Sequence, residues 1–346
     1  MIATRILRRP RVLIVGCGDV GLRCVAQWRA RRADLRIVAL TSHPARRDAL
    51  RAAGATPIVG DLDHPSTLRR LAGLAPRTVL HLAPPQADGA EDRRTRALVA
   101  ALAATTRRAS AQPAPAYGRL RRERAAARPA GSRFRAARIV PEGPRAPTLV
   151  YASTTGVYGD CGGARIDETH PLRPANPRAF RRVSAERQLR AATARGVLSA
   201  RIVRIPGIYA ANRLPLARLE RGTPALVPDD DVYTNHIHAD DLAAILLRAA
   251  ARGKPSRAVH ASDDSELRMG EYFDRVAHAF GLAPPPRVSR ADAERLLEPT
   301  LLSFMRESRR LSNARLKREL CVTLRYPTVD DFLQTLAPGG GSGQRG

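Results

Sequence analysis

Three glycines near the start of the chain have the spacing of a phosphate-binding turn. Gly16, Gly18 and Gly21 form the pattern G-x-G-x-x-G in VLIVGCGDVG, directly after an apolar run and at the start of a helical pattern. Glycines at these positions let the backbone turn tightly and approach a diphosphate, which the positive end of the following helix stabilises. We therefore predict that these glycines, with Asp19 and Val20 between them, bind a dinucleotide.

The segment after the next apolar run indicates which dinucleotide binds. It reads ALTSHPARR at 39–47 and contains Thr41, Ser42, Arg46 and Arg47 but no acidic residue. An acidic residue there would bind the ribose 2′-hydroxyl of NAD, whereas arginine accommodates the 2′-phosphate of NADP. Arginine is common throughout this chain, but the missing carboxylate favours NADP over NAD. Thr41, Ser42 and Arg46 are its expected ligands.

The elements that would position these residues follow a regular rhythm. The apolar runs VLIVG, RIVAL, TPIVG and TVLHLA alternate with helix-length polar or alanine-rich stretches, and the runs TLVYAS and ARIVRI come later. Such alternation is typical of βαβ units. We predict an α/β fold, a Rossmann-type doubly wound parallel sheet with a small C-terminal substrate-binding lobe.

Changes in composition divide the chain into domains. Residues 10–105 and 148–210 are assigned to the dinucleotide-binding domain. Residues 106–147 are rich in Pro, Ala and Arg with little periodicity, which predicts a disordered insertion. Residues 211–336 are expected to form mainly the substrate lobe, with elements that return to the core, and 337–346 a flexible tail.

The net charge of +27 raises the question of nucleic-acid binding. Of the 59 basic residues only Lys254 and Lys317 are lysines, and no aromatic residues are interleaved with the arginines to stack on bases. An arginine excess beside so much Ala and Pro is also typical of GC-rich coding. We therefore expect a small-molecule partner and no nucleic acid.

Other classes of protein are disfavoured by what the sequence lacks. No apolar run approaches the roughly 20 residues of a membrane span, and the N-terminal segment lacks the apolar core and cleavage site of a signal peptide. The four cysteines have neither disulfide-framework nor metal-ligand spacing. We expect a cytoplasmic protein with no membrane partner and no metal site.

Further motifs resemble the extended short-chain dehydrogenases/reductases, the superfamily of the NAD(P)-dependent epimerases and dehydratases. GDLDHP is similar to the family segment that contacts the adenine, a role that transfers to Asp61 and Leu62. HLAPP is similar to the family loop over the cofactor's ribose and diphosphate, which transfers to Leu82 and Ala83. The resemblance implies the Rossmann-type fold and the dinucleotide.

The second half of the chain continues the resemblance. YASTTGVYGD resembles the family's strand-end motif, in which a Ser or Thr hydrogen-bonds the reacting oxygen. That role falls on Thr154, with Ser153 beside it. RIPGIYAANRLP resembles the turn near the nicotinamide, with Pro206, and TNHIHADDLA and SNARLKRELCVTLRYPT resemble two C-terminal signatures. The substrate lining is assigned to Arg213, Asn235 and His236.

The family's acid/base pair, Tyr-x-x-x-Lys, is missing. Alignment on Ala185 and Glu186 puts Arg178 where the tyrosine stands and Arg182 where the lysine stands, and no Tyr-x-x-x-Lys occurs elsewhere. Arginine keeps the cationic, ribose-binding half of the lysine's role but stays protonated near neutrality. We expect Arg182 to bind the cofactor, whereas Arg178 cannot replace a tyrosine that exchanges its proton.

Three interpretations therefore remain open. The protein is an atypical oxidoreductase or epimerase/dehydratase-like enzyme for a small carbonyl or sugar-nucleotide-type substrate, with Thr154, Tyr158 and His236 as catalytic candidates. Alternatively it is a non-catalytic NADP(H)-binding redox sensor or regulator. In the third interpretation the alignment shifts and the proton donor lies elsewhere. The oligomeric state is open as well, with a homodimer among the expected states.

Overall fold

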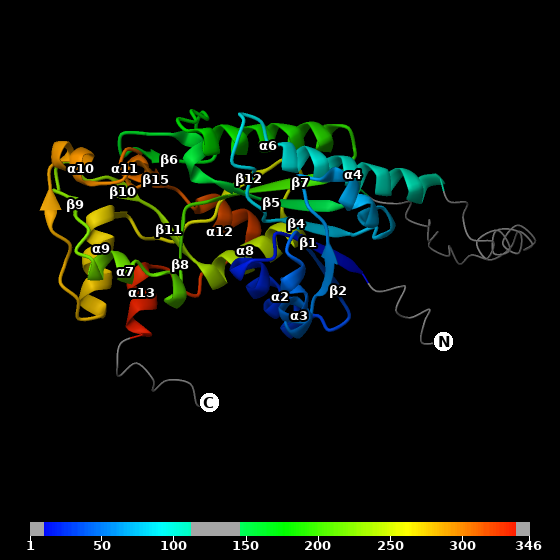
Figure 1. Cartoon of the computed structure of the whole chain (residues 1–346), viewed down its shortest axis with the longest axis horizontal. Coiled ribbons are helices and arrows are strands. Elements are labelled where there is room, and N and C mark those ends of the chain that lie inside the picture. Colours follow the sequence, from blue (N-terminus) through cyan, green and yellow to red (C-terminus); the bar gives the residue numbers. More distant parts are fainter. Residues whose placement is uncertain (1–9, 112–145, 337–346) are drawn as a thin grey trace, which may run out of the picture.

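A seven-stranded parallel sheet forms the centre of the molecule (Figure 1). The computed structural model describes residues 10–111 and 146–336. The strand order is β12-β7-β5-β4-β1-β2-β3, and every pair in it is parallel. The strands are β1 (Arg11–Val15), β2 (Arg36–Thr41), β3 (Thr56–Val59), β4 (Thr78–His81), β5 (Thr148–Thr154), β7 (Ser199–Ile205) and β12 (Ala258–His260).

This order confirms the predicted doubly wound Rossmann-type sheet. The chain proceeds outward from β1 to β3 and then in the opposite direction from β4, so that the order reverses between β1 and β4. All the strands end at one edge, and ligands of open α/β sheets bind beyond that edge at the point of reversal.

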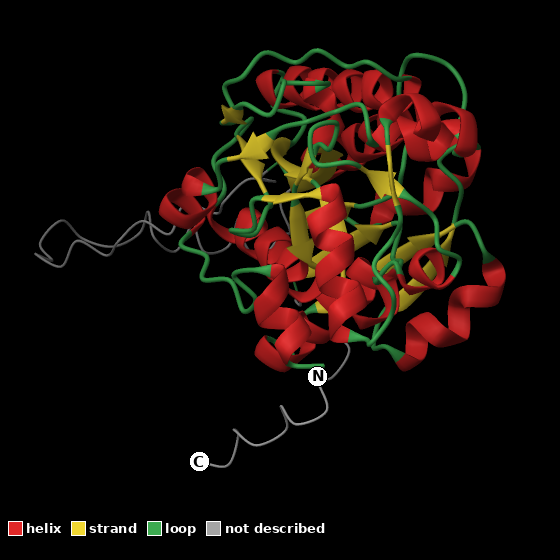
Figure 2. Cartoon of the chain, turned by 90° about the vertical axis from the view of Figure 1, so that its left-hand side faces the viewer, coloured by secondary structure: helices red, strands yellow, loops and turns green. Residues whose placement is uncertain are grey.

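Helices cover both faces of the sheet (Figure 2). Successive strand residues point to opposite faces, so Val12 and Ile14 pack on one side of β1 while Leu13 and Val15 pack on the other. The first face is covered mainly by α2 (Asp19–Arg31), α8 (Ala239–Arg252) and α12 (Ala314–Leu320), and the second by α4 (Arg93–Ala111) and α6 (Pro177–Ala194). Burial on both faces explains the continuous apolar runs of the strands.

A smaller lobe lies beyond the carboxyl edge, at the left of Figure 1, around its own apolar cluster that includes Tyr272, Phe273 and Phe332. Its helices are α7 (Leu216–Glu220), α9 (Met269–Ala279), α10 (Arg290–Leu296), α11 (Pro299–Phe304) and α13 (Val329–Gln334). Its short strands are β6 (Arg165–Ile166), β8 (Gly207–Tyr209), β9 (Ala225–Leu226), β10 (Tyr233–Thr234), β11 (His236–His238), β13 (Leu267–Arg268), β14 (Arg287–Val288) and β15 (Arg310–Leu311).

The structure differs from the expected chain division at one point. Helix α4 continues to Ala111, beyond the predicted start of the insertion at residue 106. Alanine and arginine favour helix strongly, so their abundance extends the helix where the apolar periodicity fades. Residues 112–145 of the predicted insertion, like the predicted tail from 337, lie outside the described residues.

No helix among residues 10–111 and 146–336 is long and apolar enough to cross a membrane.

One buried carboxylate fixes α6 against the sheet. Glu186 of α6 accepts two hydrogen bonds from Arg204 of β7, at 2.8 and 3.1 Å, and a third from the Ser153 hydroxyl of β5 at 2.7 Å. The side chains of Glu186 and Arg204 are at most 3% exposed. Bidentate arginine–carboxylate pairing is strongly directional. These bonds therefore set both the position and the rotation of α6.

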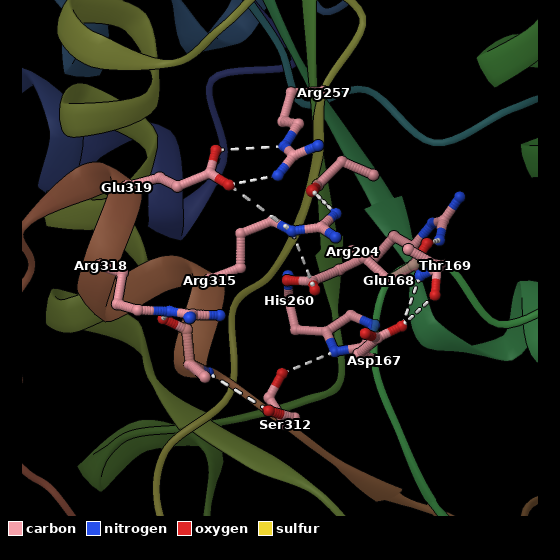
Figure 3. A network of polar contacts seen from close by, with 12 residues as sticks. Asp167, Glu168, Thr169, Arg204, Arg257, His260, Ser312, Arg315, Arg318 and Glu319 are labelled. Carbon is pink, nitrogen blue, oxygen red and sulfur yellow. Dashed lines mark hydrogen bonds and ion pairs between the residues drawn. The ribbon is translucent and has the colours of Figure 1, made fainter.

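The same arginine belongs to a larger polar network between the sheet and helix α12. Arg204 also donates to the Glu168 carbonyl at 3.2 Å, and the Glu168 carboxylate accepts the backbone N–H of His260 at 2.9 Å. Arg315 of α12 pairs with Glu168 at 3.3 Å. Figure 3 shows these side chains converging from segments far apart in the sequence. The network attaches the end of the chain to the strands that carry the site.

The buried pair gives a prediction about stability. Replacing Glu186→Ala leaves the Arg204 charge buried and unpaired, so we expect the free energy of unfolding to fall by about 3–5 kcal/mol. Urea denaturation followed by circular dichroism measures this loss. The matched control is Glu294→Ala, which removes an exposed pair with Arg306 and should cost less than about 1 kcal/mol. Similar losses in the two variants would contradict the assigned role of Glu186.

Candidate functional site

The glycine turn after β1 requires glycine at its first position. Gly16 has a φ of +82°, and a Cβ there would lie 2.5 Å from the backbone nitrogen of Ala83. The Leu82 and Ala83 N–H groups both donate to the Val15 carbonyl, at 2.8 and 3.0 Å. The loop after β4 therefore lies directly on the turn, which brings together two segments predicted to contact the cofactor.

The second glycine faces open space instead. A Cβ on Gly18 would meet no atom within 4 Å, and the helix α2 that begins after it has no side-chain cap hydrogen bond. Its first N–H groups carry the positive end of the helix dipole. Gly21 packs tightly, because a Cβ there would lie 3.1 Å from the Cys17 sulfur. An uncapped helix end beneath an open glycine fits the diphosphate of a dinucleotide.

Asp19 and Val20 lie between Gly18 and Gly21. Val20 packs against the core, and the charge of Asp19 is neutralised by neighbouring arginines. The Asp19 carboxylate pairs with Arg23 at 3.3 Å and with Arg213, from the lobe side, at 3.1 Å. Burial acts to raise the pKa of Asp19, but the hydrogen bonds and charges of Arg23 and Arg213 outweigh it and hold that pKa below its ordinary value. The turn can therefore offer its N–H groups to a diphosphate despite this acidic residue.

The residues predicted to select NADP lie after the end of β2. Thr41 is buried and accepts the His43 N–H at 3.2 Å, while Ser42 is exposed. Arg46 ends a short 3₁₀ helix. Burial raises the pKa of the Cys17 thiol to about 11, and the charge of Arg46 acts in the opposite direction. This influence on Cys17 indicates that Arg46 lies near the glycine turn.

The two residues predicted to contact the adenine, Asp61 and Leu62, follow the end of β3. Asp61 is partly exposed, whereas Leu62 is buried. Asp61 accepts the Asp63 N–H at 3.0 Å and contacts His64 at 3.1 Å, and mainly the backbone bond holds the pKa of Asp61 below its ordinary value. Leu62 is buried in the core. Its backbone can border a cofactor, but its side chain packs inward.

A cavity of about 510 Å³ opens between the carboxyl edge of the sheet and the lobe. Seven of its lining residues were singled out from the sequence, and five of them are Thr154, Arg178, Arg182, Pro206 and His236. The expected lobe residues Arg213 and Asn235 also line it. The cavity therefore combines a strand end, the helix α6 and the lobe, three parts far apart in the sequence.

Helix α6 presents both of its key arginines to this cavity. Arg182 donates to the Ala152 carbonyl at 2.6 Å and to the Tyr151 hydroxyl at 3.1 Å, which holds it beside the end of β5. Arg178 lies one turn earlier and also lines the cavity. This geometry agrees with the alignment in which Arg178 and Arg182 stand where the family has tyrosine and lysine.

Two neighbouring hydroxyls at the end of β5 point in opposite directions. Thr154 lines the cavity, and its Oγ accepts the Gly156 N–H at 3.3 Å. Ser153 is buried, bonds Glu186 and is not among the lining residues. Adjacent residues of a strand face opposite sides, so only one of them can face the cavity. The expectation that Ser153 binds the cofactor is not supported.

Tyr158 does not face the cavity either. Its side chain is fully buried, and its hydroxyl lies 2.6 Å both from Arg204 and from His260. Burial raises the pKa of Tyr158 to about 12. A buried phenol that is already bonded twice and is absent from the cavity lining has no route to a substrate oxygen. The geometry therefore argues against Tyr158 as the proton donor.

His236 does line the cavity, although the protein around it covers most of its ring. The ring stacks on Tyr272 with centroids 4.3 Å apart. Burial lowers the pKa of His236 to about 4, so the imidazole is neutral at physiological pH. Its Nδ1 has no hydrogen-bond partner within the described part of the chain.

Several lining residues were not foreseen from the sequence. Asn176 caps α6, accepting the Ala179 N–H at 2.9 Å, and at the same time borders the cavity. Glu307 and Arg309 come from the segment after α11, where no motif pointed to them. Glu307 is the only carboxylate among the described lining residues. Only the fold brings this segment to the strand end.

Comparison with known proteins places the chain in a family. Residues 12–261 match the model of the NAD dependent epimerase/dehydratase family. The 2'-dehydrokanamycin reductase of Streptomyces kanamyceticus is 28% identical over 145 residues, which are 38% of this chain and 41% of the reductase. The chain thus spans about two-fifths of the length of the curated relative it matches.

Solved structures agree on the fold. A functionally unknown conserved protein from Silicibacter pomeroyi superposes with a TM-score of 0.70 and 28% identity, covering 94% of this chain and 98% of its own. MoeE5 in complex with UDP-glucose and NAD superposes with a TM-score of 0.62 and 20% identity, over 94% and 96%. The family match spans most of the sheet and the cavity edge. The chain therefore belongs to the NAD dependent epimerase/dehydratase family, with its Rossmann fold of the short-chain dehydrogenase/reductase type.

Proposed function

We propose that the protein binds NADP(H) at the glycine turn and carries out oxidoreduction, or an epimerase/dehydratase-like reaction, on a substrate in the adjoining cavity. The observation that carries the proposal is that the open face of Gly18, the Arg182 guanidinium and the Thr154 hydroxyl all lie along one edge of the sheet. Such an edge binds a dinucleotide in folds of this type.

Each of these residues has a defined task in the proposal. A bound nicotinamide dinucleotide supplies or accepts hydride. The N–H groups after Gly18 bind its diphosphate, and Arg182 binds the nicotinamide ribose in place of lysine. Thr154 donates a hydrogen bond to the reacting oxygen of the substrate. The lobe covers the cavity and limits the access of water, which strengthens these electrostatic contacts.

The charge of the cavity supports an anionic substrate of the sugar-nucleotide type. Five arginines and a single carboxylate, that of Glu307, line the cavity. The arginines are Arg178, Arg182, Arg213, Arg218 and Arg309. A cleft lined by one sign of charge attracts ligands of the opposite sign. The UDP-glucose bound by MoeE5 is an anion of this kind, and small carbonyl compounds with a phosphate or carboxylate share its chemistry.

The alternative is an NADP(H)-binding redox sensor that does not turn its cofactor over. The observation that favours it is Arg178, which stands where the family keeps its proton-exchanging tyrosine and cannot release its own proton near neutrality.

Dinucleotide binding at the turn predicts different effects for two glycines. Gly18→Asn keeps a residue suited to capping α2 but fills the open space, so the dissociation constant for NADPH should rise at least about tenfold, a loss of about 1.4 kcal/mol. Its melting temperature should stay close to that of the wild type.

Gly16→Ala should weaken NADPH binding and also lower the melting temperature, because its Cβ collides with Ala83. NADPH fluorescence titration and thermal denaturation measure both. Undiminished NADPH binding by Gly18→Asn would exclude this turn as the site.

Cofactor selection predicts a tighter affinity for NADPH than for NADH. Hydrogen bonds to charged groups contribute about 1.5–3 kcal/mol, so Arg46→Ala should weaken NADPH binding about tenfold or more and leave NADH binding unchanged. Arg51→Ala, on the same segment but paired with Asp48, is the matched control. Calorimetric titration with both nucleotides checks this. If the wild type binds NADH as tightly as NADPH, the preference for NADP is wrong.

Enzyme and sensor are distinguished by turnover. We expect the absorbance of NADPH to fall when the protein is incubated with one or more members of a panel of carbonyl compounds and nucleotide sugars. An epimerase/dehydratase-like reaction returns its hydride to the substrate and consumes no cofactor overall, so the same panel is also incubated with protein and NADP⁺, and new products are measured by chromatography. Each assay is repeated with Gly18→Asn protein, which should show no such decrease. Tight NADPH binding with no turnover across the panel would favour the sensor.

A further inference from the structure

The proposed reaction needs a group that exchanges a proton, and most of the cavity's titratable side chains are unsuited to it. Burial raises the pKa of Tyr209 and of Tyr272 far above the ordinary value, so neither phenol is easily ionised. Burial lowers the pKa of His236 to about 4, which makes its imidazole a weak base, and its ring is covered by Tyr272. The five arginines stay protonated. Glu307 and Tyr233 are the remaining titratable groups of the described lining.

Glu307 lies beside the expected reaction centre. A Cβ built on Gly156 would lie 3.7 Å from Thr154 Oγ1 and 3.8 Å from Glu307 Oε2, and the nearest other atom is a Thr154 carbon. The hydroxyl and the carboxylate therefore flank the same small volume, which glycine leaves open. All three residues line the cavity. A substrate oxygen that accepts a hydrogen bond from Thr154 would be close to this carboxylate.

The Glu307 carboxylate is held in a defined orientation by two donors. Asn176 Nδ2 donates to Oε1 at 3.3 Å, and Arg309 Nη1 donates to Oε2 at 2.9 Å. Arg309 is itself fixed, since the same nitrogen donates to the Gly159 carbonyl at 2.7 Å. A carboxylate has about four acceptor positions, so two donors leave capacity for a substrate. The side chain is 13% exposed, which keeps it accessible.

Charged neighbours on several segments act on this carboxylate. Arg309 pairs with it directly, and Arg178 of α6 lines the same cavity. Asp160 accepts the Ser308 N–H at 2.8 Å and adds a like charge nearby. Cys161 is also close, because Glu307, Arg309 and Asp160 all influence its thiol electrostatically. The Glu307 carboxylate is therefore bordered by two cations and by one further carboxylate.

We propose that Glu307 exchanges the proton of the reacting oxygen, the task that the missing tyrosine performs in the family. This inference rests on the proposed function. In the oxidative direction the substrate O–H bond breaks and its proton passes to the Glu307 carboxylate. The carbon loses a hydride, with its bonding pair, to the oxidised nicotinamide dinucleotide, and the C–O bond becomes C=O. In the reductive direction the protonated carboxyl returns its proton to the oxygen that becomes the hydroxyl.

The test compares Glu307→Gln with the matched control Glu294→Gln, whose side chain pairs with Arg306 on the surface. Glutamine keeps the size and an acceptor oxygen for Asn176 but cannot exchange a proton. General acid–base catalysis contributes about 10²–10⁴-fold, so kcat should fall by that factor while NADPH affinity is kept. The acid limb of the kcat–pH profile of the oxidative direction should disappear. Glu294→Gln should behave like the wild type. Glu307→Asp, which keeps a carboxylate, should retain part of the activity even if the glutamine variant folds poorly.

A second readout does not depend on turnover. Binding of UDP-glucose, measured by calorimetry across pH, should weaken in the wild type as Glu307 becomes ionised, because the ligand is an anion. Glu307→Gln should remove this dependence, and Glu294→Gln should keep it. Identical pH dependence of binding in the wild type and in Glu307→Gln would overturn the placement of Glu307 beside the substrate.

The outcomes separate this inference from the function on which it rests. If the wild type turns over a substrate and Glu307→Gln is as active, Glu307 is not the proton-exchanging group but the proposed function stands. If Tyr233→Phe or His236→Gln lowers kcat more than Glu307→Gln does, the replaced residue, and not Glu307, exchanges the proton of the reacting oxygen. A wild type that binds NADPH but turns over nothing overturns both.

Discussion

Glu186 is the only acidic residue of α6, and its carboxylate is shared between two neighbouring strands. Arg204 on β7 and Ser153 on β5 both bond to it in a region closed to water. A charge in such a place tolerates little movement, because a lost partner leaves it uncompensated. Helix α6 can therefore take only one orientation about its own axis, the one in which Glu186 faces β5 and β7. With Glu186 directed inward, Arg182 and Arg178, one and two turns earlier, are directed to the cavity.

The site is consequently assembled from two kinds of support. The sheet edge supplies the glycine turn, the loop after β4 and Thr154, all positioned by backbone hydrogen bonds and close packing. The lobe supplies His236, Glu307 and Arg309, positioned by side-chain contacts that cross long stretches of chain. In the proposed function the glycine turn of the first set binds the diphosphate of the dinucleotide, whereas Thr154 binds the reacting oxygen of the substrate. The second set lines the same cavity as Thr154 and borders the substrate there.

This difference explains what the sequence could predict. The glycine motif and the apolar runs are local patterns, so the sheet and the turn followed from them. The register of α6 came instead from alignment of Ala185 and Glu186 with the family's helix. Ser153 and Tyr158 were chosen from a motif that fixes position along the chain but not the direction of a side chain. Strand alternation turns Ser153 away, and burial against Arg204 encloses Tyr158. Glu307 carried no signal, since its closeness to Thr154 exists only after some 150 intervening residues have folded.

The replacement of tyrosine and lysine by arginine has a consequence beyond the loss of a proton donor. Guanidinium groups do not titrate within the range in which proteins stay folded. The positive potential that these arginines give the cavity is therefore nearly constant from acidic to alkaline conditions, whereas the potential from a lysine and a phenol would vary at high pH. Once Glu307 is ionised, attraction of an anionic ligand by these arginines depends on ionic strength far more than on pH. Salt concentration is the natural variable for controlling how strongly this cavity holds its ligand.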